Sequence, residues 1–109
     1  MKFFTTYQAS SKAFAIYPAQ TAVEYVTLGL ASEAGEVAGK VKKVLRDKQG
    51  DFTAEDVEAI GAELGDVLWY IAQLATELGL GLDEIATANI EKLQDRQQRQ
   101  VLQGSGDKR

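Results

Sequence analysis

The sequence predicts an all-α protein, an antiparallel bundle of four helices. Apolar residues recur every three or four positions over long stretches, which is the period of an amphipathic helix. No stretch of useful length alternates with the two-residue period of a strand. Short polar or glycine-containing connections separate the stretches, as in bundles with antiparallel neighbours.

The first two helices are bounded by a proline and a capping motif. A helix is expected over about residues 6–16, ending before Pro18, because a proline disfavours helical backbone in the preceding residue. Thr21 and Glu24 have the spacing of a capping box, which predicts the start of a second helix that runs to about Leu45.

The third and fourth helices follow polar connections. Thr53 is expected to cap the third helix, with Asp56 as its capping-box partner, and the helix is expected to end near Gly79. The fourth helix is expected from about Asp83 to the glutamines at 97–100.

The chain of 109 residues is predicted to be one domain, 1–109, whose glycine-rich tail, 103–109, is expected to be flexible. Cysteine and histidine are both absent, which excludes disulfides, thiolate or imidazole metal sites and Ser-His-Asp chemistry. The net charge of −4 argues against a general nucleic-acid partner. The N-terminal residues lack the hydrophobic core of a signal peptide and no apolar run would span a membrane, so a cytoplasmic protein is expected.

Two pairs of acidic residues carry the clearest chemical signal. Glu33 and Glu36 are three residues apart on the second helix, and Glu63 and Asp66 have the same spacing on the third. Residues three apart share one helix face, so two packed helices would crowd four carboxylates together. A hard cation such as Mg²⁺ relieves that repulsion and prefers oxygen ligands. The pattern predicts a magnesium site.

Other polar residues follow the same edge of each apolar stripe. Packed together, these edges would form a groove in which acids hold the metal and cations balance phosphate oxygens. The residues expected to contact the substrate in this groove are Lys40, Lys43, Tyr70, Asn89, Lys92 and Arg96. The alternative for Asn89, Lys92 and Arg96 is an ordinary solvated position on the helix surface.

The patterns also have ordinary structural interpretations. Glu-x-x-Glu and Glu-x-x-Asp occur on many solvated helix faces, and Glu36 with Lys40 has the spacing of a common supporting ion pair. Trp69 is better explained by packing in a core or a subunit interface, whereas Tyr70 shares the face of the carboxylates and has a ring suited to stacking on a base.

Four segments together resemble a known family. Leu28–Val37 contains the first acid pair, Glu63–Tyr70 contains the second, Asn89–Arg96 has the pattern Asn-x-x-Lys, and Gly104–Arg109 reads Gly-Ser-Gly-Asp-Lys-Arg. These segments, with the spacer between the acid pairs, are similar to the all-α MazG-like nucleoside triphosphate pyrophosphohydrolases. The resemblance covers nearly the whole chain.

The resemblance implies hydrolysis of a (deoxy)nucleoside triphosphate between its α and β phosphates, giving a nucleoside monophosphate and pyrophosphate. It implies that Glu33, Glu36, Glu63 and Asp66 are both the metal ligands and the catalytic acids, with Mg²⁺ as cofactor and Mn²⁺ able to replace it. Lys40, Lys43, Lys92 and Arg96 would bind phosphate, Tyr70 a phosphate or the sugar, and Asn89 the nucleoside. It also implies a homodimer or homotetramer, in which the fourth helix or the tail completes the site of another subunit.

Three biological roles fit these features. House-cleaning of the nucleotide pool is the leading one. The others are a phosphoribosyl-ATP pyrophosphatase and a catalytically silent helical adaptor, whose acids would only make the bundle soluble or bind a structural cation. The preferred base cannot be assigned, since base pockets select through hydrogen bonds that spacing does not reveal.

Overall fold

A computed structural model of the chain describes residues 2–109, in which the regular secondary structure is helical and no strand is present. The predicted all-α class and the four helices are confirmed. Two single-turn 3₁₀ helices, at Lys12–Phe14 and Ala19–Thr21, lie between the first two α-helices. The four α-helices are α1 (Lys2–Ser11), α2 (Ala22–Lys48), α3 (Ala54–Glu77) and α4 (Leu82–Gln98).

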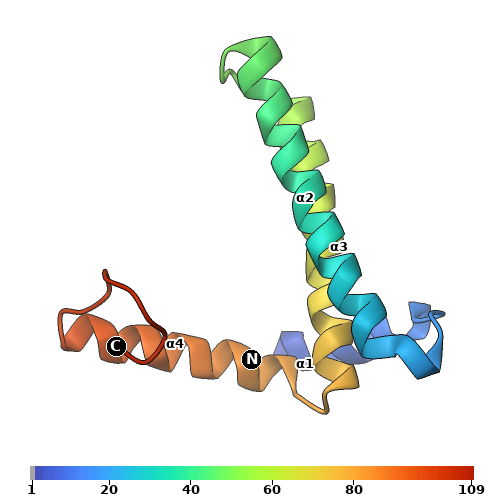
Figure 1. Cartoon of the computed structure of the whole chain (residues 1–109), viewed down its shortest axis with the longest axis vertical. Helices are drawn as coiled ribbons and strands as arrows, with labels where there is room; N and C mark the ends of the chain where they lie inside the picture. Colours follow the sequence, from blue (N-terminus) through green and yellow to red (C-terminus); the bar gives the residue numbers. More distant parts are fainter. Residues whose placement is uncertain (1) are drawn as a thin grey trace.

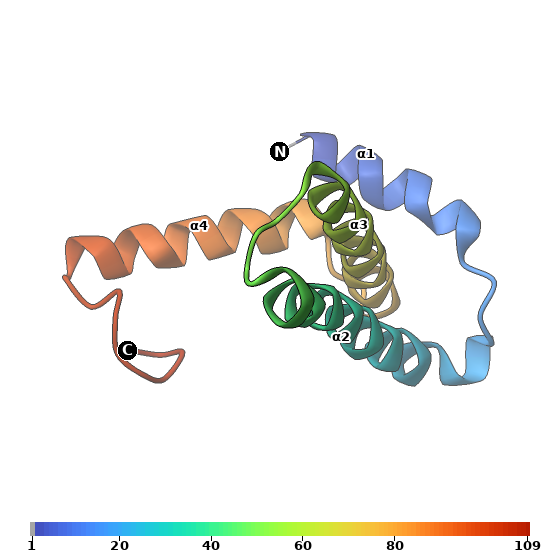
Figure 2. The same cartoon turned by 90° about the horizontal axis from the view of Figure 1, so that it is seen from above.

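The molecule is built on a long antiparallel hairpin of α2 and α3 (Figures 1 and 2). Helix α1 packs across α3 and α4 at the open end of this hairpin. Helix α4 then leaves that end and projects away from the hairpin (Figure 1). The radius of gyration is 16.8 Å, whereas a compact domain of this length has one of about 13 Å.

The prediction of a four-helix bundle within one chain is therefore wrong in the placement of α4. Helix α4 packs against α1 and α3 rather than lying along the hairpin. The consequence is a small core and many exposed apolar side chains, among them Leu28 at 71% and Ile90 at 46% exposure. The periodicity of a helix identifies its apolar face but not the surface that covers that face. The residues that are buried and apolar are Ala22, Val26, Val44, Ala72, Ala75 and Leu82.

One of the two predicted capping boxes forms. At the start of α3 the Thr53 hydroxyl accepts a hydrogen bond from the Asp56 amide at 3.2 Å, and the Asp56 carboxylate accepts one from the Thr53 amide at 3.0 Å. The box predicted at Thr21 and Glu24 is wrong. Thr21 ends a 3₁₀ turn with φ −122° and ψ 26°, outside the extended backbone of a usual N-cap, and its side chain makes no capping bond.

The Asp56 carboxylate also ties α3 to the end of α2, because Lys48 donates to it at 2.8 and 2.9 Å. These hydrogen bonds, with that from Thr53, lower the pKa of Asp56 from 3.8 to about 2. Folding thus stabilises the ionised form. The resulting stability is present above pH 3.8 and is lost as the pH falls toward 2.

We expect Asp56→Asn to lower the melting temperature at neutral pH, because it removes the charge that Lys48 contacts. The difference from the wild type should narrow as the pH falls from 3.8 toward 2. Thermal unfolding followed by circular dichroism between pH 2 and 7 measures this difference. Asp51→Asn, which removes an exposed acid just before the cap, is the matched control and should show no such narrowing. A difference in melting temperature that stays the same at every pH would contradict a stabilising contact between ionised Asp56 and Lys48.

Gln8 on α1 holds the start of α4 in place. Its amide nitrogen donates to the Thr76 hydroxyl at 3.0 Å and to the Leu80 carbonyl at 2.9 Å, and its amide oxygen accepts from the Leu82 backbone N–H at 2.7 Å. The last bond satisfies one of the amides that a helix N-terminus leaves free. One side chain thus bonds the end of α3, the turn and the first residue of α4.

We expect Gln8→Ala to lower the free energy of unfolding by about 1–3 kcal/mol, the usual cost of leaving partly buried polar groups unpaired. Urea unfolding measures the loss, and hydrogen exchange at the Leu82 amide should become faster in the variant. Gln20→Ala, at an exposed glutamine between α1 and α2, controls for loss of a glutamine side chain. Equal effects of the two substitutions would show that Gln8 does not hold this turn.

In the part of the chain that the structure describes, no helix is both long and apolar enough to cross a membrane.

Candidate metal and phosphate site

Three acidic side chains from the two hairpin helices converge on one point. Glu33 on α2 and Glu63 and Asp66 on α3 each offer a carboxylate oxygen, and these oxygens lie within 4.8 Å of one another. We call these three residues the acid trio. Glu33 and Glu63 are half-buried and Asp66 is exposed. The antiparallel hairpin brings the two acid motifs face to face, as expected from their spacing.

The electrostatics of the trio reflect this crowding. Burial raises the pKa of Glu33, and a hydrogen bond with Glu63 and the negative charges of Asp66, Glu63 and Glu36 raise it further. The pKa values of Tyr70 and Tyr7 are also raised, first by burial and then by neighbouring groups that include Asp66. The trio is thus a site of concentrated negative potential with two phenols near it.

The donor set suits Mg²⁺. Three carboxylates on two rigid helices supply hard oxygen ligands, and Mg²⁺ commonly combines a few carboxylates with waters and substrate phosphates. Its charge would offset the repulsion that raises the pKa of Glu33. Glu36 is exposed and lies outside the trio, although its charge still acts on Glu33. The structure therefore brings three of the four predicted acids together.

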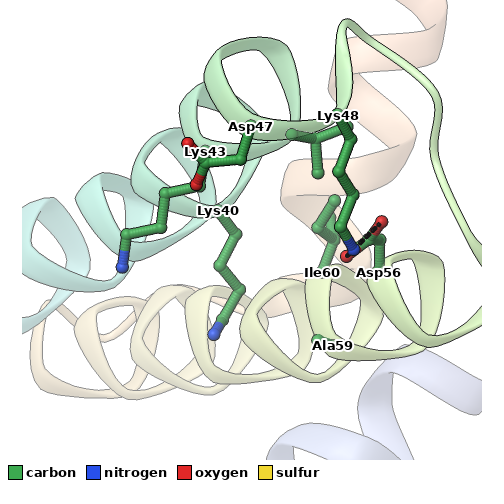
Figure 3. Close-up of a pocket in the computed structure, with 8 residues that line it drawn as sticks. Lys40, Lys43, Asp47, Lys48, Asp56, Ala59 and Ile60 are labelled. Atoms are coloured by element: carbon green, nitrogen blue, oxygen red, sulfur yellow. Dashed lines mark hydrogen bonds and ion pairs between the residues drawn. The ribbon is translucent and has the colours of Figure 1, made fainter.

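Lysines extend the site toward the closed end of the hairpin. The Lys40 amine lies 3.8 Å from a carboxylate oxygen of Glu63, so it adjoins the trio. Lys40 and Lys43 line a groove of about 230 Å³ between α2 and α3. In Figure 3 both side chains extend away from the Lys48–Asp56 ion pair, which occupies the other end of this groove. Of the two lysines, Lys40 is the one that the structure shows in contact with an acid of the trio.

On the other side of the trio is an aromatic pocket that includes Tyr70. The Tyr70 ring packs edge-on against Trp69, with ring centroids 5.0 Å apart. It also lies against Gly29 of α2, where a methyl group would overlap it. The predicted packing role of Trp69 agrees with its hydrogen bond to the Ser11 carbonyl at 3.1 Å. The pocket has a volume of about 300 Å³ and is lined by Phe14, Ile16, Tyr17, Pro18, Tyr25, Trp69 and Tyr70.

The three predicted site residues of α4 are not brought to the trio within this chain. Asn89, Lys92 and Arg96 lie beyond the first turns of α4, the helix that projects away from the hairpin (Figure 1). Asn89 is exposed, and Lys92 and Arg96 bond to Asp107 of the tail. Lys92 and Arg96 share an edge of α4, as their spacing predicts, but the direction of α4 separates that edge from the acids.

Two residues near the trio were not predicted from the sequence to belong to the site. Gly29 gives Tyr70 its place against α2, and a glycine inside a helix is a signal for such a close approach. Tyr7 of α1 is close enough to Asp66 for that charge to raise its pKa. Its position depends on how α1 crosses α3, for which the sequence has no local signal.

Comparison with known proteins agrees with this geometry. The family model described as the MazG nucleotide pyrophosphohydrolase domain matches residues 21–101, which include the acid trio and the groove lysines. The chain is also similar to the "Gene 37 protein" of Mycobacterium phage L5, with 50% identity over 94% of this chain and 96% of the phage protein. No solved structure was found to match. The domain match covers most of the chain, and the protein belongs to the MazG nucleotide pyrophosphohydrolase family.

Proposed function

We propose that this protein hydrolyses (deoxy)nucleoside triphosphates between the α and β phosphates, producing a nucleoside monophosphate and pyrophosphate. The observation that carries the proposal is the acid trio with Lys40 beside it. Acids that bind a divalent cation and lysines that bind phosphate are both needed for a magnesium polyphosphate substrate, and here they share one face of the hairpin. House-cleaning of the nucleotide pool is the role that we favour.

Glu33, Glu63 and Asp66 would hold Mg²⁺ or Mn²⁺, and a turn of the Glu36 side chain would supply a fourth carboxylate. The bound ion would lower the pKa of water and offset negative charge on the pyrophosphate leaving group. A carboxylate of this set that is free of the ion would accept the proton of the attacking water as general base.

The remaining side chains bind and orient the substrate. Lys40 and Lys43 would bind the phosphates that extend along the groove, since each ammonium donates to oxyanions as a mobile point charge. Tyr70 lines the aromatic pocket and is close enough to Glu33 and Asp66 for their charges to raise its pKa, so it would contact the α-phosphate or the sugar. Stacking in that pocket would hold the base, with the specific base set by hydrogen bonds.

A homodimer or homotetramer would complete the site. One chain leaves apolar residues exposed on α2, α3 and α4, an arrangement typical of surfaces that another copy covers. Asn89, Lys92 and Arg96 would then approach the acids of a second copy. Light scattering after size-exclusion chromatography should give a mass at least twice the 11.9 kDa of the chain. A monomeric enzyme with full activity would remove these α4 residues from the site.

The activity is tested by measuring pyrophosphate release from phosphoribosyl-ATP and from a panel of ribo- and deoxynucleoside triphosphates, with and without Mg²⁺. Mg²⁺-dependent release that is lost in Glu36→Gln would support both the reaction and the fourth ligand. Release only from phosphoribosyl-ATP would favour that pyrophosphatase instead. No release from any of these substrates by folded protein would leave the silent adaptor as the explanation.

A further inference from the structure

The tail folds back and contacts α4 through Asp107. One carboxylate oxygen of Asp107 lies 2.8 Å from the Lys92 amine and 3.2 Å from the Arg96 guanidinium. The guanidinium also donates to the Asp107 backbone carbonyl. The Arg96 side chain is only 7% exposed, while that of Asp107 is 77% exposed. A buried cation on α4 is thus paired with an acid that lies at the surface on a loop.

The loop that carries Asp107 is held by Arg109. The Arg109 guanidinium donates to three backbone carbonyls, those of Val101 at 3.1 Å, Leu102 at 2.6 Å and Gly106 at 2.7 Å. Gly104 has a φ of +126°, and a side chain there would lie 3.3 Å from the Arg109 side chain. We call residues 101–109, closed by these bonds, the tail clasp. In this structure these bonds define the path of the backbone, and the flexibility expected for residues 103–109 stays a prediction.

The two cations that the clasp contacts, Lys92 and Arg96, have the chemistry of an oxyanion-binding site. Lys92 and Arg96 present two positive charges to one carboxylate, which leaves an excess of one positive charge. A guanidinium and an ammonium that converge on one point also suit phosphate, which carries more negative charge than a carboxylate and offers more acceptor oxygens. Hydrogen bonds from Lys92 and Arg96 lower the pKa of Asp107, so the carboxylate is ionised at neutral pH and occupies the place of such an anion.

We propose that Lys92 and Arg96 form a binding site for a phosphate-class oxyanion, and that Asp107 keeps this site closed until the anion replaces it. The inference rests on the proposed function in one respect, since there the same two cations bind substrate phosphate. It adds that the chain's own tail competes for them. Binding of the anion and release of the clasp would then be one equilibrium, and closure of the clasp would weaken the apparent affinity for the anion.

Inorganic pyrophosphate is the probe, titrated calorimetrically into the whole protein at low salt in EDTA, so that no metal occupies the acids. A clasp closed nine-tenths of the time reduces apparent affinity about tenfold, so Asp107→Asn should bind pyrophosphate about tenfold more tightly than the wild type. Asp95→Asn is the matched control. It removes the same charge from an exposed acid on α4 that pairs with Arg99, and should change the affinity less than about twofold. Adding Lys92→Gln to Asp107→Asn should abolish the gain.

Backbone NMR relaxation provides a second readout in the unmodified protein. Order parameters of residues 101–109 should fall when pyrophosphate is added, because the anion releases the clasp. Unchanged order parameters at saturating pyrophosphate would overturn the proposal. So would an Asp107→Asn variant that binds pyrophosphate no better than the wild type, since Asp107 would then only orient the two cations. Neither readout involves hydrolysis, so the two proposals are tested separately. The clasp proposal can be wrong while the proposed hydrolysis is right, and the hydrolysis can be wrong while the clasp proposal is right.

Discussion

Glu63→Gln is expected to reduce Mg²⁺-dependent pyrophosphate release by about 10²–10³-fold or more, the loss seen when one preorganised electrostatic group is removed from a site. Glu63 has this importance because it lies next to both the other acids and a lysine of the groove. Its carboxylate belongs to the acid trio and is also 3.8 Å from the Lys40 amine. The substitution keeps the shape of the side chain, so the positions of α2 and α3 should be preserved.

The metal-free variant should be at least as stable as the wild type. Removing one of three crowded carboxylates relieves repulsion within the trio, and that repulsion is one cause of the raised pKa of Glu33. Added Mg²⁺ should raise the melting temperature of the wild type, because it binds the native state, and should raise that of Glu63→Gln much less. Activity assays and thermal unfolding with and without Mg²⁺ measure the two effects.

Glu58→Gln is the control for this substitution. Glu58 is an exposed acid on the same helix and lies outside the trio, so its loss changes the net charge by the same amount. It should leave both the activity and the response to Mg²⁺ close to those of the wild type. If Glu63→Gln retained full activity, or if Glu58→Gln lost as much, the trio would not be the metal site.

The trio and the fold class were predictable because local rules determine them. A three-residue spacing puts two acids on one helix face, and a short connection makes successive helices antiparallel, so the motifs of α2 and α3 were expected to meet. Glu36, which lies outside the trio, shows that spacing does not determine which of the four acids converge. The cap formed by Thr53 and Asp56 is equally local. Thr21 shows the limit of such rules. Thr21 and Glu24 have the same spacing as Thr53 and Asp56 but form no capping box, because Thr21 belongs to a 3₁₀ turn.

The placement of α4 was not predictable from the sequence, because it depends on contacts between residues far apart in the chain. Its direction depends on bonds from Gln8, which is more than seventy residues from Leu80 and Leu82 in sequence. Helical periodicity predicted that Asn89, Lys92 and Arg96 share an edge, and said nothing about where that edge would point. The contacts of Lys92 and Arg96 with Asp107 likewise depend on how the tail turns. Composition describes that tail only as rich in glycine.

Gly29→Ala is expected to lower both stability and activity. In most helices this substitution stabilises, by about 0.5–1 kcal/mol, since alanine restricts the unfolded chain. Here the added methyl group would overlap the Tyr70 ring, and overpacking of this kind typically costs about 1–3 kcal/mol. The cost of the overlap should exceed the gain from the backbone, giving a net loss of about 1–2 kcal/mol in urea unfolding. Activity should fall as well, because the ring that must move adjoins the acids.

Gly35→Ala separates the backbone gain from the cost of overlap. Gly35 is on the same helix, and within 4 Å a methyl group there would meet no described atom other than its chain neighbours and the nearby helix backbone, so this variant should gain stability through the restricted backbone alone. Replacing Tyr70 by alanine in the Gly29→Ala background should recover the stability lost to overlap, a coupling measured by the double-mutant cycle. Additive effects of the two substitutions would mean that Gly29 and Tyr70 act independently. Strong coupling would instead identify Gly29 as the residue that allows the Tyr70 ring to lie against α2 beside the acids.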